Sequence, residues 1–242
     1  IPLSQQFMTS KERTIVFIPG YQSVVPSTKS IYLEQFCQQH NLTYVTFNHD
    51  FSPESSVETW YKNFLCILKN QTEGQLILVG SSLGVWLALL LFHRDEEDAV
   101  QIRSRICGIV GVGTSVNSTE RWLNEIESEE KRIDRAYVYR RPSLYSSTGY
   151  YDILVAKLLD SKEYILPMES GKVYVNCSVI MLHGICDTDV PYHHAIDVLK
   201  LLDVPLGKIC ELRLIHDGDH RLSRQEDLIR IHGALLDLIS FC

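Results

Sequence analysis

The sequence has little of what a nucleic-acid-binding or membrane-spanning protein needs. It carries 23 Lys and Arg against 30 Asp and Glu, for a formal net charge of −7, and it has no long basic run. Phosphate backbones are bound mainly by clustered cations, so we expect no nucleic-acid partner. The best uncharged apolar run, residues 83–92, falls short of the roughly 20 residues that cross a bilayer. We therefore expect a globular protein with no membrane span.

The sequence lacks the cysteine spacing of the usual metal sites. The seven cysteines form no CxxC pair, and several, such as Cys66 and Cys107, lie in apolar runs. We interpret them as buried, reduced thiols, and we expect no metal and no organic cofactor. Four Asn-x-Ser/Thr sequons leave secretion as a minor alternative. The chain begins with Ile1, so we expect a leader to have been trimmed.

Short apolar segments alternate with segments of helical periodicity along most of the chain. This order is typical of an α/β fold with a mostly parallel central sheet, covered by helices through right-handed crossovers. We expect strands at 14–18, 43–47, 76–79, 106–112, 179–183 and 209–215. We expect helices from about 27, at 57–69, 83–93, 194–202 and 224–239.

One segment, residues 114–175, breaks the alternation. Two stripes of apolar residues there, one from Trp122 to Tyr137 and one from Tyr151 to Leu158, predict two helices. Charges are dense at 125–135, which is typical of a solvated face. We expect residues 1–242 to form a single domain in which 114–175 is a helical lid that shapes an acyl pocket.

The sequence Gly-Ser-Ser-Leu-Gly at 80–84 matches the G-x-S-x-G pattern of a nucleophile elbow. A buried strand runs directly into it and an apolar helix leaves it, which is the context that the motif requires. The glycines suit a turn in which a Cβ would collide with backbone. The sequence therefore predicts that Ser82 is a nucleophile; the alternative is a plain turn in which Ser82 caps the helix.

A serine nucleophile needs a base, and in this fold the acid and the histidine follow in later loops. The loop after the strand at 179–183 holds Asp187 and Asp189, and the loop after 209–215 holds His220. Asp189 can instead cap the helix expected after Pro191. We therefore predict Ser82, Asp187 and His220 as the catalytic triad. The other histidines are interpreted as structural or surface residues.

Attack on a carbonyl also needs donors for the developing oxyanion. One is the N–H of the residue after the nucleophile, Leu83; the other comes from the loop after an early strand. That loop is Pro19-Gly20-Tyr21, and we predict Tyr21 N–H as the second donor. The alternative is that Pro19-Gly20 only forms a turn.

With these residues identified, the chain resembles mitochondrial α/β-hydrolase domain-containing proteins known as palmitoyl-protein thioesterases and acyl-glucuronide esterases. The resemblance covers nearly the whole chain. Its most specific carriers are Gly-Ser-Ser-Leu-Gly-Val-Trp-Leu at 80–87 and Asp-His-Arg at 219–221. The catalytic Ser, Asp and His of that family fall on Ser82, Asp187 and His220.

The resemblance implies a serine hydrolase that cleaves acyl thioesters or esters through an acyl-enzyme, with an acylated protein or a small acyl ester as substrate. It also implies a mitochondrial location, with cytosolic or secreted as alternatives. The rival functions are a general carboxylesterase or lipase, and a binding protein that keeps the fold without turnover. Non-catalytic members typically lose a triad residue, and here all three are present.

Overall fold

The computed structural model describes residues 13–52 and 55–242. A six-stranded sheet, all of whose pairings are parallel, runs through the molecule in the order β10-β8-β4-β3-β1-β2. Its strands are β1 (Arg13–Ile18), β2 (Thr43–Thr46), β3 (Gln75–Ser81), β4 (Ile106–Val112), β8 (Ser178–Gly184) and β10 (Cys210–Ile215). The predicted fold class, a parallel sheet covered by helices, is confirmed.

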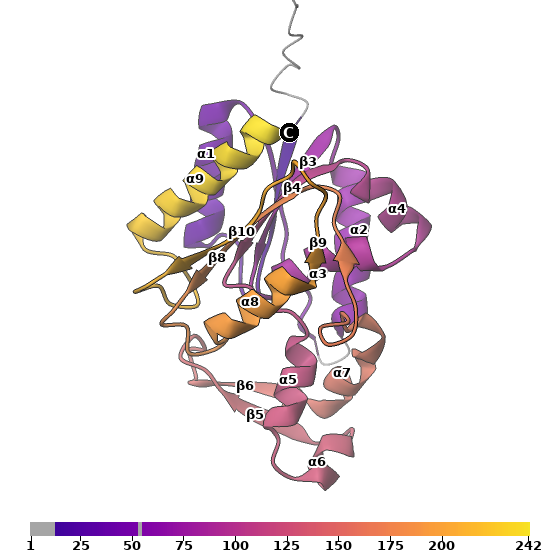
Figure 1. The fold of residues 1–242 in the computed structure, drawn as a ribbon. Helices are drawn as coiled ribbons and strands as arrows, with labels where there is room; N and C mark the ends of the chain where they lie inside the picture. Colours follow the sequence, from indigo (N-terminus) through magenta and orange to yellow (C-terminus); the bar gives the residue numbers. More distant parts are fainter. Residues whose placement is uncertain (1–12, 53–54) are drawn as a thin grey trace, which may run out of the picture.

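Helices cover both faces of this sheet, as Figure 1 shows. They are α1 (Thr28–His40), α2 (Val57–Gln71), α3 (Leu83–His93), α4 (Glu97–Arg103), α8 (Tyr192–Leu201) and α9 (Gln225–Phe241). Five of the six were predicted. The short helix α4, which buries only Ala99 and Ile102, was not, because so little apolar surface gives a weak periodic signal.

Alternate residues of each strand divide the core into two layers. Val16 and Leu78 point toward α2 and α3, whereas Phe17 and Val79 point toward α1 and α9. The central strands are buried on both faces, so they read as continuous apolar runs in the sequence. On α1, Ile31 is 46% exposed, whereas Leu33 packs inward.

The segment between β4 and β8 differs from the prediction of two helices. It contains α5 (Ser118–Glu125), α6 (Glu129–Ile133), β5 (Val138–Pro142), β6 (Tyr150–Leu154), α7 (Val155–Asp160), a 3-10 turn (Lys162–Tyr164) and β7 (Val173–Tyr174). Strands β5 and β6 form an antiparallel hairpin, and β7 pairs with β9 (Leu202–Asp203). The stripe from Tyr151 to Leu158 therefore belongs partly to a strand, since a short apolar run fits either periodicity.

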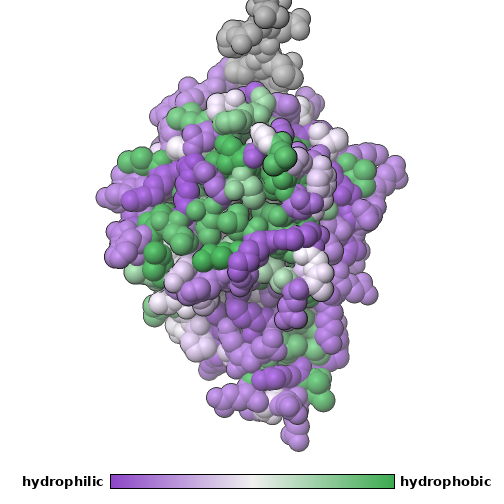
Figure 2. All heavy atoms as spheres, viewed as in Figure 1, coloured by the Kyte–Doolittle hydropathy of each residue, from purple (hydrophilic) through white to green (hydrophobic). Residues whose placement is uncertain are grey.

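This inserted segment lies beyond the sheet, at the bottom of Figure 1. It has a small core of its own, formed by Trp122, Ile126, Ile153, Val155 and Leu158. Helix α6 buries no residue, so the charge-dense stretch is a solvated face as expected. In Figure 2 this end of the molecule is mostly hydrophilic, while apolar side chains gather over β10, β9 and α8.

The cysteine interpretation needs a correction. Cys107 on β4 and Cys242 form a disulfide across a sequence separation of 135 residues. Cys37 and Cys177 are buried free thiols as expected, whereas Cys66, Cys186 and Cys210 are exposed. Sequence spacing could not reveal the disulfide, because α9 brings the C-terminus against β4 only in the folded chain. Within the described residues, no helix is both long and apolar enough to cross a membrane.

Candidate active site

Ser82 occupies the sharp turn between β3 and α3. Its backbone has φ +52° and ψ −114°, a strained conformation for a residue with a side chain, and its N–H donates to Val112 O at 2.8 Å. A Cβ on Gly80 would lie 2.6 Å from Val85 N, and one on Gly84 would overlap the backbone of Ile18. The two glycines are therefore required for the turn that presents Ser82 above the sheet.

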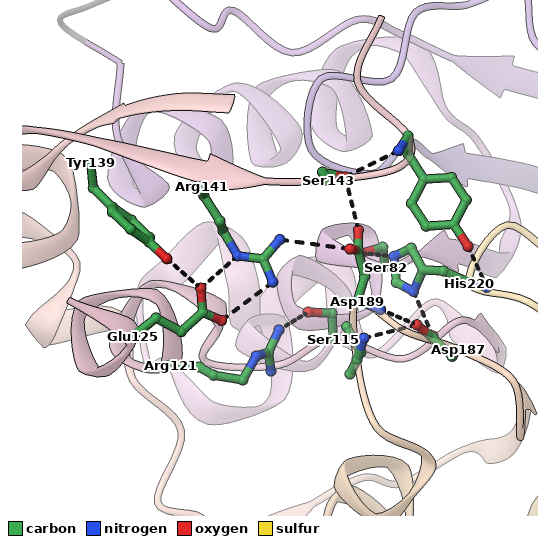
Figure 3. Close-up of polar contacts among 12 residues, drawn as sticks. Ser82, Ser115, Arg121, Glu125, Tyr139, Arg141, Ser143, Asp187, Asp189 and His220 are labelled. Carbon is green, nitrogen blue, oxygen red and sulfur yellow. Dashed lines mark hydrogen bonds and ion pairs between the residues drawn. The ribbon is translucent and has the colours of Figure 1, made fainter. Parts of the chain in front are cut away.

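The structure brings together the three residues that the sequence predicted. His220 Nε2 lies 3.0 Å from Ser82 Oγ, and His220 Nδ1 lies 2.6 Å from Asp187 Oδ2. The three side chains come from loops after β3, β8 and β10 (Figure 3), at the carboxyl ends of the strands where α/β sheets present their sites. This geometry allows proton transfer from Ser82 to His220, with Asp187 orienting the ring.

Asp187 is held by four N–H groups. Its Oδ1 accepts from the backbone N–H of Asp189 at 2.9 Å and of Val190 at 2.8 Å, and its Oδ2 contacts His220 and also His183 Nε2 at 3.2 Å. Burial alone would raise the pKa of Asp187, but the hydrogen bonds from His183, His220 and Val190 outweigh it. The pKa therefore lies well below its ordinary value, and Asp187 is an anion at neutral pH.

His183 was missed by the sequence analysis. Its side chain is fully buried, and its Nε2 lies 3.0 Å from Val190 O, which can only accept a hydrogen bond. Nε2 therefore carries the proton, shared between Val190 O and Asp187 Oδ2, and Nδ1 is buried with no hydrogen-bond partner among the described residues. The feature of the sequence that could have identified His183 is its ionisable side chain in a mainly apolar strand, β8.

The role predicted for Asp189 is wrong. Helix α8 begins at Tyr192 with Pro191 at its N-cap position, and no side chain caps it. Asp189 instead accepts a hydrogen bond from Ser143 Oγ at 3.3 Å and lies 3.8 Å from Arg141 Nη1 (Figure 3). Both partners belong to the inserted segment. The role of Asp189 therefore depends on long-range contacts, which a local sequence pattern does not reveal.

The predicted oxyanion donors lie next to Ser82. Leu83 is the first residue of α3, so its N–H has no intrahelical acceptor. Gly20 is so close to the elbow that a Cβ there would lie 3.2 Å from Ser82 Cβ, which places the Gly20-Tyr21 loop against the nucleophile. The Tyr21 ring packs edge-on against Trp122 and Tyr151 of the insertion. The donor role of both N–H groups remains a prediction.

Two further residues hold the loop of His220. Tyr145 Oη accepts a hydrogen bond from His220 N–H at 3.2 Å, and the Arg221 guanidinium lies over the Tyr145 ring. Lys29 Nζ donates to Arg221 O at 2.5 Å and to Ser223 Oγ at 3.2 Å. Burial lowers the pKa of Lys29 to about 8. The sequence analysis predicted neither contact, because each joins residues that are far apart in the sequence.

A cavity of about 320 Å³ opens over Ser82 and His220. Among the aromatic and aliphatic residues of the insertion, Trp122, Tyr145 and Tyr151 line it, whereas Leu144 is 83% exposed. Most of the lining is polar, from residues such as Gln22, Ser27, Ser115, Arg121 and Arg141. The insertion contributes to the cavity, but it does not form a purely apolar pocket. No three potential metal ligands gather in the described part of the chain.

The parallel sheet, the strained serine turn and the Ser-His-Asp arrangement at the strand ends define the class: this is an α/β hydrolase. No family model matches the chain. It is 31% identical to a bovine protein named mitochondrial palmitoyl-protein thioesterase ABHD10, over 98% of this chain and 76% of that one. The human protein of the same name is 29% identical over the same shares.

Comparison with solved structures supports the same family. Mouse α/β-hydrolase domain-containing protein 10 superposes with a TM-score of 0.82 at 26% identity, over 96% of this chain and 92% of that one. A structure described as a putative hydrolase from Agrobacterium vitis has a TM-score of 0.81 at 25% identity, over 94% and 88%. The chain belongs to the ABHD10 family of α/β hydrolases, and it is a hydrolase of esters or thioesters.

Proposed function

We propose that this protein is a serine hydrolase in which Ser82 is the nucleophile, His220 the general base and Asp187 the acid of a catalytic triad. The observation that carries the proposal is the pair of contacts at His220, 3.0 Å to Ser82 Oγ and 2.6 Å to Asp187 Oδ2. A non-catalytic binding protein would have no need for a strained serine aligned with a histidine and a buried carboxylate.

Hydrolysis then proceeds in two acyl transfers. His220 takes the proton of Ser82 as Oγ attacks the acyl carbonyl, and Asp187 stabilises the imidazolium that forms. The N–H groups of Tyr21 and Leu83 bind the oxyanion. His220 returns the proton to the departing thiol or alcohol, which leaves an acyl-enzyme, and water releases the acid by the same steps. No metal or organic cofactor takes part.

For the substrate we propose acyl thioesters and esters, of the kind cleaved by S-depalmitoylases and acyl-glucuronide esterases. The names of the relatives, palmitoyl-protein thioesterases, support a thioester substrate and a mitochondrial location. A general carboxylesterase acting on oxygen esters is the second candidate. The polar lining and the 320 Å³ volume favour it, because they suit a short or polar acyl group better than a long apolar one.

We propose that residues 1–242 form one domain and that 114–175 form its lid. Support comes from the contacts between the insertion and the site: Tyr145 holds the His220 backbone, and Ser143 and Arg141 contact Asp189. Trp122 and Tyr151 pack on Tyr21 in the oxyanion loop. The insertion thus covers the triad from the side opposite the sheet.

The test is covalent labelling with a fluorophosphonate together with turnover of a neutral ester. Ser82→Ala should abolish labelling and lower turnover by several orders of magnitude. Ser104→Ala, an exposed serine at the end of α4, should change neither. Labelling that survives in Ser82→Ala would reject the assigned nucleophile. One acyl chain offered as thioester and as oxygen ester, with correction for uncatalysed rates, decides between thioesterase and carboxylesterase.

A further inference from the structure

Arg121 forms no ion pair with any described residue, although it lines the same cavity as the proposed nucleophile. It extends from α5 and lines the cavity that Ser82 and His220 line. Its Nη2 donates to Ser115 Oγ at 3.0 Å, while its Nε and Nη1 are buried and have no hydrogen-bond partner among the described residues. Burial, with Arg141 nearby, lowers the pKa of Arg121 to about 10. A buried cation in this state is unfavourable unless something supplies negative charge.

The neighbouring Arg141 shows the contrast. Its Nε and Nη2 bind the two oxygens of Glu125 at 2.9 and 3.3 Å, and its Nη1 lies 3.8 Å from Asp189. Glu125 is four residues after Arg121 on α5 and could have paired with it on the helix surface. Figure 3 shows that it turns to Arg141 and Tyr139 instead. Glu125 and Asp189 thus pair directly with Arg141, and Arg121 feels these carboxylates and Asp187 only at longer range, without an ion pair among the described residues.

The charge of the cavity has the opposite sign to that of the chain. The chain carries a formal net charge of −7. Apart from His220, the described residues that line the cavity include four basic side chains, Lys29, Arg121, Arg141 and Arg221, and a single carboxylate, that of Asp189. A concave site lined by one sign of charge concentrates ligands of the other sign. The cavity therefore favours an anion.

The position of Arg121 indicates which part of the substrate carries this anion. The leaving group must take its proton from His220 Nε2, so it lies on the His220 side of the carbonyl carbon. In the view of Figure 3, Arg121 lies to the left of Ser82 and His220 lies to its right. The acyl part of the substrate therefore extends toward Arg121, which lines the cavity together with Trp122 and Ser115.

From these observations, and resting on the proposed function, we propose that Arg121 binds a carboxylate on the acyl group of the substrate. The enzyme then prefers monoesters or monothioesters of dicarboxylic acids over esters of neutral acids with the same chain length. Trp122 contacts the methylenes between the two carboxyl carbons, and Arg121 binds the free carboxylate. This preference is separate from the chemistry at Ser82, which serves either acyl group.

The test compares the 4-methylumbelliferyl monoester of glutaric acid with 4-methylumbelliferyl valerate, at a pH where the free carboxylate is ionised. The ratio of their kcat/KM values, each corrected for its uncatalysed rate, should exceed about 10 in the unaltered protein. In Arg121→Gln the ratio should fall by about 30-fold or more, because an anion placed in this site would lose its partner. A ratio cancels any general loss of activity in the variant.

Arg121→Lys, which keeps the positive charge, should restore part of the ratio. The matched control is Arg140→Gln on β5, whose guanidinium is exposed and paired with Asp152, and it should leave the ratio unchanged. A second substrate pair, 4-carboxyphenyl valerate and phenyl valerate, places the carboxylate on the leaving group. This pair should show no dependence on Arg121.

Two results would overturn the proposal. The first is a ratio at or below 1 in the unaltered protein, or a ratio that Arg121→Gln leaves unchanged, which would mean that Arg121 is structural. The second is an Arg121 dependence confined to the carboxylated leaving group, which would move the anion to the other side. In both cases turnover of the neutral valerate ester would still support the proposed serine hydrolase. Failure of the Arg121 proposal can therefore be distinguished from failure of the proposed function.

Discussion

His183 and His220 share one oxygen of Asp187. His183 Nε2 approaches Oδ2 to 3.2 Å and His220 Nδ1 approaches it to 2.6 Å, so the carboxylate is held between two imidazoles. The first of these rings is fully buried, and the hydrogen bond of its Nε2 to Val190 O fixes its tautomer. We infer that His183 fixes the position of Asp187 before substrate arrives.

His183→Phe should therefore lower both stability and turnover. The variant loses a donor to a charged group, a loss worth about 1.5–3 kcal/mol in the free energy of unfolding, and kcat should fall as Asp187 becomes less ordered. His183→Gln, which retains an N–H, should recover part of both. Denaturant unfolding and ester turnover measure the two effects. A His183→Phe variant with unaltered kcat and stability would contradict this role.

The two carboxylates of the loop after β8 should behave differently. Asp187→Asn should lower turnover by about 10⁴-fold, because the amide favours the wrong tautomer of His220. Asp189→Asn should act through Arg141 and Ser143 of the insertion, and its effect on kcat should be far smaller. Turnover of both variants checks this, and a larger loss in Asp189→Asn would reverse the assignment.

The serine turn should tolerate no side chain at its second glycine. Gly84→Ala would place a Cβ within the backbone of Ile18 and should destabilise the fold by about 3 kcal/mol or more, with loss of Ser82 labelling. Gly233→Ala on α9 is the matched control. Nothing lies within 4 Å of its added Cβ, so it should stabilise the helix by about 0.5–1 kcal/mol. Thermal unfolding distinguishes the two.

Lys29 should make stability rise with pH. Burial lowers its pKa to about 8 in the folded protein, while the unfolded chain keeps a value near 10.4. Between these values the unfolded state binds the proton and the folded state does not, so the contribution of Lys29 to folding becomes more favourable as pH rises. Lys29→Met should remove this rise between about pH 8 and 10, measured as the difference between two unfolding curves. Equal slopes would contradict the assignment.

The sequence predicted the parts of the candidate site whose positions follow from the order of neighbouring strands, turns and helices along the chain. The buried strand, glycine turn and apolar helix around Ser82 form one contiguous pattern, and the loops with Asp187 and His220 follow two further apolar strands. The same alternation predicted all six sheet strands and their parallel pairing, but not their order across the sheet.

What the sequence did not predict depends on contacts between distant segments. The carboxylate of Asp189 turns to Arg141 rather than to the nearby helix, and Lys29 reaches Arg221 across 192 residues. The residues that join β5 to β6 have no strong turn motif, so the sequence pattern there was interpreted as helical. The disulfide between Cys107 and Cys242 likewise depends on where the last helix docks.

The order of strands in the sheet has a consequence for a chain that is made from its N-terminus. Ser82 follows β3 in the middle of the sheet, but His220 follows β10, which pairs with β8 at the edge and is the last strand in the chain. The proposed nucleophile therefore lacks its proposed base until Cys210–Ile215 has been synthesised and paired. We therefore expect a nascent or truncated chain that lacks β10 to have little activity toward acyl substrates, and full activity to appear only when the final strand completes the sheet.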